Sequence, residues 1–67
     1  MTRKDYVLIA EALKEARAEI RSKEPPECVA ALNDGVSYAA EELAFYLYRD
    51  NQRFDRERFL RAAGVQS

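Results

Sequence analysis

The chain has no histidine, no tryptophan and a single cysteine among its 67 residues. Without histidine it lacks the commonest general base and the commonest metal ligand. One cysteine can form neither an internal disulfide nor a zinc site, so neither device can stabilise this short chain. We therefore expect no metal, no cofactor and no enzymatic activity. We expect Cys28 to be a small buried apolar side chain in a reducing cytosol.

Long hydrophobic runs are also missing. The apolar run near the N-terminus, residues 6–10, is too short for the core of a signal peptide and far too short for a transmembrane helix. The sequence therefore predicts a cytoplasmic protein without a membrane partner.

Large apolar side chains are scarce, although 48% of the residues are hydrophobic. Alanine, which buries little surface, accounts for 11 residues, and Leu, Ile, Val and Phe together account for only 15. A chain of this length rarely gains more than about 3–5 kcal/mol from its own core. We expect a single domain over residues 1–67 that is marginally stable as a monomer.

Helix breakers are few, and alanine, leucine, glutamate and arginine dominate. The two prolines are adjacent at Pro25 and Pro26, and no alternation typical of β-strands is present. The fold class predicted is all-α, a three-helix mini-bundle with a long central helix. Its helices are expected at about 3–22, 26–50 and 55–63.

Local signals support the helix boundaries. Thr2 and Asp5 have the spacing of a capping box at the start of the first helix. Asp55 is a candidate N-cap of the third helix, and Gly64 suits the left-handed position after its end. The doubtful point is residues 33–35, Asn-Asp-Gly, which either form a turn that divides the central helix or lie within it. The unbroken apolar periodicity favours a continuous helix.

Two apolar stripes recur at helical spacing and predict the core. The first helix contributes Tyr6, Ile9, Ala10, Leu13, Ala16 and Ile20. The second contributes Cys28, Leu32, Val36, Ala39, Leu43, Tyr46 and Leu47.

Other large side chains lie away from these stripes. They are Val7, Leu8, Tyr38, Phe45, Tyr48 and Arg49. A helix with apolar residues on two sides is either central in its own fold or shared with another chain. We predict that these six residues form an interface, most simply that of a twofold dimer, because two short helices cannot easily cover a long one on both sides. The alternative is that the first and third helices cover both sides within one monomer.

Charge is uneven along a chain whose net charge is only −1. Residues 24–48 hold five acidic side chains and no basic one, whereas residues 49–61 hold five arginines and three acids. Arg53, Arg56, Arg58 and Arg61 are the candidate contacts to nucleic acid, in a turn like that of a helix-turn-helix. The interleaved acids and a pI near 5.4 argue against such binding. The alternative is that the arginines pair with the acidic central helix, in the same chain or in a partner.

Two stretches carry a resemblance to a known set of proteins. They are residues 2–6 (TRKDY) with 8–10 (LIA), and residues 50–51 (DN) with 53–60 (RFDRERFL) and 63–64 (AG). Together, over about a third of the chain, they resemble short uncharacterised proteins of bacteriophages and prophages, particularly those of actinobacteria. The resemblance implies an accessory protein in the host cytoplasm, without established catalytic residues. Together with the predicted interface, it leads us to expect a protein that acts by binding a host or phage protein. Relatives often carry cysteine where this chain has Ala63, which favours a packing role for that position.

Overall fold

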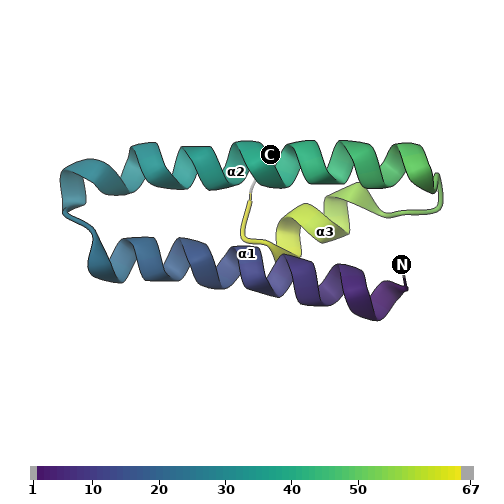
Figure 1. Ribbon diagram of the computed structural model, residues 1–67, viewed down its shortest axis with the longest axis horizontal. Helices are drawn as coiled ribbons and strands as arrows, with labels where there is room; N and C mark the ends of the chain where they lie inside the picture. Colours follow the sequence, from purple (N-terminus) through teal and green to yellow (C-terminus); the bar gives the residue numbers. More distant parts are fainter. Residues whose placement is uncertain (1, 66–67) are drawn as a thin grey trace.

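The computed structural model describes residues 2–65 and places them in three α-helices. Helix α1 covers Arg3–Lys23, α2 covers Pro26–Asp50 and α3 covers Arg56–Ala62. The long helices α1 and α2 form an antiparallel hairpin, and α3 folds back against both of them near the end that holds the N-terminus (Figure 1). Each helix contacts the other two. The predicted all-α three-helix fold is confirmed, and α2 runs unbroken through Asn33, Asp34 and Gly35.

The boundaries of α1 and α2 follow from their end residues. The Asp5 carboxylate accepts hydrogen bonds from the backbone N–H and the hydroxyl of Thr2, at 3.0 and 3.3 Å, so the acidic residue reaches back to the cap as predicted. Glu24 is extended because Pro25 follows it. Pro26 then begins α2, where its missing N–H costs nothing.

Helix α3 has only seven residues and is fixed at both ends. The Asp55 side chain accepts from the backbone N–H of Arg58 at 3.0 Å. Gly64 adopts a φ of 80°, and the N–H of Val65 donates to the carbonyl of Leu60 at 2.9 Å, as in a Schellman motif. Both predicted caps are confirmed.

The three helices meet around a small core that consists mainly of alanine. Its members are Ala10, Ala40, Ala44, Phe54, Phe59, Ala63 and Val65. The ring of Phe54 contacts Tyr6 edge-on, with centroids 4.7 Å apart. It also lies 5.4 Å from Phe59, a contact between the residue before the N-cap of α3 and the fourth residue of that helix, which is known as a hydrophobic staple. Among the described residues no large side chain is completely buried. The fold is therefore held by close helix contact and two phenylalanines.

The predicted core stripe of α2 is only partly correct. Val36 and Leu47 are half-buried, but Leu32 and Leu43 are 42% and 39% exposed. Cys28, predicted to be buried, is exposed. The buried side of α2 is instead centred on Ala40 and Ala44, about 60–100° around the helix from Leu43. The small alanine side chains let the neighbouring helices pack closely against α2, whereas leucine at these positions would hold them apart.

Polar groups take part in the contact between α1 and α2. The guanidinium of Arg17 donates to the carbonyl oxygen of Asn33 at 3.2 Å and to the hydroxyl of Ser37. Asn33 is 8% exposed, and its side-chain oxygen has no hydrogen-bond partner. The sequence pattern did not indicate this contact, because Arg17 and Asn33 are polar residues inside an apolar periodicity.

Candidate functional site

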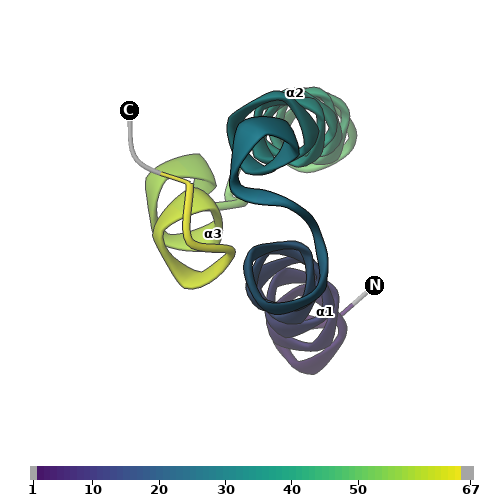
Figure 2. The ribbon, with the colours of Figure 1, turned by 90° about the vertical axis from the view of Figure 1, so that its left-hand side faces the viewer.

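The hairpin is covered on one side only. Viewed along the helices, α3 lies on one side of the plane through α1 and α2, and no described element lies on the other side (Figure 2). Glu41 and Tyr48 line a cleft with α3, so this side of α2 faces the third helix. Leu43 lies about 160° around α2 from Glu41 and therefore faces the uncovered side.

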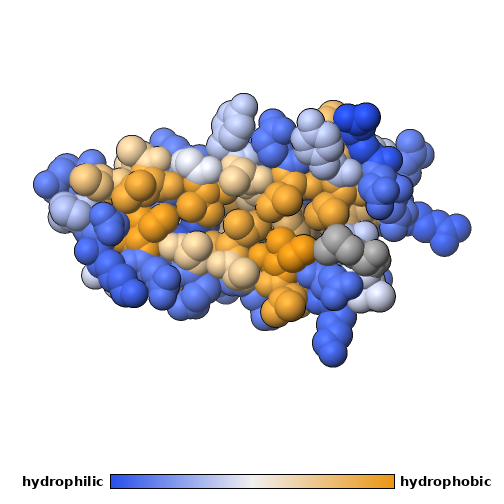
Figure 3. All heavy atoms as spheres, viewed as in Figure 1, coloured by the Kyte–Doolittle hydropathy of each residue, from blue (hydrophilic) through white to orange (hydrophobic). Residues whose placement is uncertain are grey.

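We call this uncovered surface the open face. By helical phase and exposure it comprises Ile9, Ala12, Ala16 and Ile20 of α1 and Leu32, Val36, Ala39, Leu43 and Tyr46 of α2. Hydrophobic side chains form a continuous band over both helices on this side of the molecule (Figure 3). The middle of the open face is apolar, and charged residues of the same helical phase, Asp5, Lys23 and Asp50, lie at its two ends. Contiguous exposed apolar surface of this kind is typical of interaction sites.

The six residues predicted as an interface are exposed, but the structure does not bring them together. Tyr38 and Phe45 lie on the outer side of α2, about 140–160° from Ala40. Leu8 lies on the outer side of α1, which faces away from them across the hairpin. Val7 lines the cleft between α1 and α3 instead.

The last two predicted interface residues contact neighbouring groups. The Arg49 guanidinium carbon lies 5.8 Å from the ring centroid of Phe45 and 5.6 Å from that of Tyr46, which connects this residue to the edge of the open face. Tyr48 faces α3, where the guanidinium carbon of Arg56 lies 5.7 Å from its ring centroid. The six residues therefore do not form one continuous surface.

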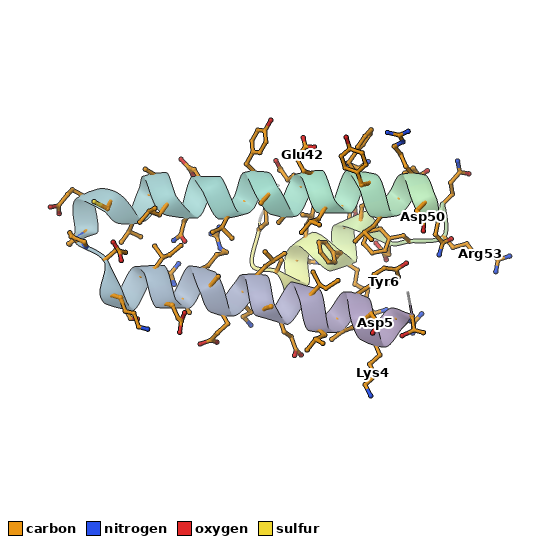
Figure 4. The ribbon with its side chains drawn as sticks, viewed as in Figure 1. Lys4, Asp5, Tyr6, Glu42, Asp50 and Arg53 are labelled. Carbon is orange, nitrogen blue, oxygen red and sulfur yellow. The ribbon has the colours of Figure 1, made fainter. Side chains whose placement is uncertain are left out.

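The four arginines proposed as nucleic-acid contacts are also divided. Arg56 and Arg61 line the cleft between α2 and α3. Two acidic residues line it beside them, Glu57 of α3 and Asp55 at its N-cap. Arg53 and Arg58 line a separate cleft of about 280 Å³ between α1 and α3. Figure 4 shows Arg53 extending from the end of the molecule into solvent. Helix α3 separates the two pairs, so they do not form one basic stripe.

The arginines also do not pair with the acidic helix of their own chain. Within residues 2–65 the one ion pair joins Lys23 to Glu19 at 3.6 Å, on the surface of α1. The expectation of arginine–carboxylate pairs inside the monomer is therefore wrong. Their exposed guanidinium groups remain accessible to another molecule.

The two adjacent glutamates of α2 do not converge on a common point. Glu42 projects outward from α2 (Figure 4), whereas its neighbour Glu41 faces α3. No group of three or more histidine, cysteine, aspartate or glutamate residues in this part of the chain could hold a metal ion.

In the part of the chain that the structure describes, no helix has the length and apolar character needed to cross a bilayer.

No protein-family model, curated protein or solved structure matches the chain.

Proposed function

We propose that the protein is a non-catalytic helical interaction module that binds another protein chain through its open face. The candidates are a second copy and, as the resemblance to phage proteins implies, a host or phage protein. The observation that carries this proposal is the distribution of apolar side chains. The core is filled largely by alanine, whereas Leu32, Leu43 and Tyr46 remain 39–58% exposed on one side of the hairpin.

Burial of these side chains would supply the energy of binding. Apolar surface contributes about 25 cal/mol for each Å² removed from water. The folded chain leaves its largest aliphatic side chains partly in water, so a partner that covers them gains free energy that the monomer cannot. Tyr46 and Arg49, at the edge of the open face, are residue types enriched at binding hot spots.

A pull-down from a lysate of an actinobacterium, the kind of host that the resemblance implies, tests this proposal. The bait is the immobilised protein, compared with a Leu32→Glu/Leu43→Glu variant of the open face and a Tyr38→Glu/Phe45→Glu variant of the outer side of α2. We expect the wild type and the outer-side variant to bind the same chain, either a host protein or an untagged copy of this protein. The open-face variant should not bind it. Equal binding by all three baits would contradict the role of the open face.

Nucleic-acid binding is the second candidate, favoured by the absence of ion pairs at the arginines in residues 2–65. It predicts affinity for DNA or RNA that falls steeply between about 50 and 200 mM salt, because bound cations are released from phosphate. Arg53→Ala/Arg58→Ala should then weaken binding and lower the salt slope, whereas Arg21→Ala at the other end should not. No binding at low salt would exclude this function.

A further inference from the structure

We infer that a second copy of this chain covers the open face, with the two hairpins packed face to face and head to tail as the two layers of a four-helix arrangement. This inference rests on the proposed function, because it names the partner of the same surface. In this arrangement α2 packs against α2 of the second copy and α1 against α1, with each pair antiparallel. The loops between α1 and α2 then lie at opposite ends of the dimer.

The surface area of the chain is larger than that of a compact monomer of its mass. Folded monomers of 7.7 kDa have an accessible area of about 4,300 Å² by the usual scaling, whereas this chain has 5225 Å². The difference, about 900 Å², is close to the roughly 800 Å² that each partner buries in a standard interface. The hairpin is also elongated, at 39 × 18 × 14 Å, and has a radius of gyration of 12.3 Å against about 11 Å for a compact chain of this length.

The shape and charge of the open face favour a copy of itself. Two packed antiparallel helices of similar length form a flat layer, and two such layers stack into a four-helix bundle. The middle of the face is apolar and does not select a charged partner, and its charged residues, Asp5, Lys23 and Asp50, lie only at its ends. The net charge of −1 adds little repulsion between copies.

The charges at the two ends of the hairpin favour the head-to-tail arrangement. Residues 3–5 and 49–58 lie at one end and carry six basic and four acidic side chains. Residues 19–34 lie at the other end and carry two basic and four acidic ones. A head-to-tail dimer brings the positive end of each copy beside the negative end of the other, whereas a head-to-head dimer brings like ends together.

Small residues near the middle of both helices suit close contact at the twofold axis. The open-face residues of α2 extend from Leu32 to Tyr46, and Ala39 lies at their centre. Ala12 and Ala16 lie near the middle of α1. In the proposed dimer Ala39 therefore meets Ala39 of the second copy.

Sedimentation equilibrium at micromolar concentration tests the dimer directly. We expect the wild type to have twice the chain mass of 7.7 kDa. Leu43→Glu should raise the dissociation constant at least about a hundredfold, because it buries a charge at the interface. Tyr38→Glu on the outer side of α2 is the matched control and should leave the mass unchanged. Circular dichroism checks that both variants stay helical, and Leu32→Glu replaces Leu43→Glu if the latter unfolds.

Cross-linking tests the arrangement. In a Cys28→Ser background, Ala39→Cys should form a disulfide-linked dimer on mild oxidation, and Tyr38→Cys should not. A dimer that does not cross-link through position 39 would overturn the head-to-tail arrangement, since α2 would not then face its counterpart.

If the wild type stays monomeric up to about millimolar concentration, the inference that a second copy covers the open face is wrong. The pull-down remains a separate test of the proposed function in that case. A host protein lost with Leu32→Glu/Leu43→Glu would leave the open face as a binding surface for a different chain.

Discussion

Asn33 is a polar residue in a buried position that does not satisfy its hydrogen-bonding capacity. Its side-chain oxygen is buried without a hydrogen-bond partner, and leaving such a group unpaired costs about 1–3 kcal/mol. We expect Asn33→Ala to raise the free energy of unfolding by about 1 kcal/mol, since alanine also has the higher helix propensity. Urea denaturation followed by circular dichroism measures it. Asp34→Ala, at an exposed neighbour, reports the propensity gain alone, and a loss of stability in Asn33→Ala relative to this control would contradict the expectation.

The two glycines provide a matched pair of substitutions with opposite outcomes. Gly64 has a φ of 80°, so Gly64→Ala should cost about 1 kcal/mol. Gly35 lies inside α2, where an added Cβ meets no atom within 4 Å, so Gly35→Ala should stabilise the fold by about 0.5–1 kcal/mol. Thermal unfolding of both variants checks the signs. A stabilised Gly64→Ala would mean that the Schellman end is not formed in solution.

At the scale of single residues, the sequence supports predictions where chemistry is local. The roles of Asp5, Asp55 and Gly64 follow from spacing within one turn, and the structure contains them. The burial of Asn33 and the exposure of Cys28 depend on the position of distant helices, so no nearby residue signals them.

Helix α3 depends on contacts outside itself, because seven residues are too few to form a stable helix in water. Phe59 anchors it and is 4% exposed. We expect Phe59→Ala to cost about 3–5 kcal/mol, enough to unfold so small a domain. Phe45→Ala is the matched control, since Phe45 is 45% exposed and should cost less than about 1 kcal/mol.

Chemical denaturation of the two phenylalanine variants compares these costs. Similar losses would mean that α3 does not dock in solution, or that the outer side of α2 is covered by another chain. The second possibility is recognised by a change in sedimented mass for Phe45→Ala.

The sequence predicts where the helices begin and end, but not which of their sides other helices cover. Pro26, Asp55 and Gly64 mark boundaries that agree with the structure to within two residues. Helical periodicity also placed Leu32, Val36 and Leu43 on one side of α2. It could not show that α3 covers the alanine side next to this stripe, because that depends on where a short helix docks after a turn. For the same reason the sequence predicts that Tyr38, Phe45 and Leu8 are exposed, but it does not predict that they lie on different sides of the hairpin.

At the scale of the whole molecule, association should be visible as a dependence of stability on concentration. A chain that folds and pairs through the open face gains stability with its own concentration by mass action. We expect the thermal midpoint to rise by several degrees between about 5 and 500 μM. Leu43→Glu should remove this dependence, whereas Tyr38→Glu should keep it. A wild-type midpoint that is constant over this range would argue against the dimer.

The placement of alanine inside the helix contacts and leucine outside them has an evolutionary consequence. Mutations that alter what the protein binds and mutations that alter whether it folds should occur at different positions. Enlarging Ala40 or Ala44 would force the helices apart, since both are completely buried, whereas Leu32 and Leu43, at 42% and 39% exposed, can be exchanged for other apolar residues at a smaller cost to the fold. The protein can therefore acquire a new partner by exchanging its leucines while its alanines stay fixed.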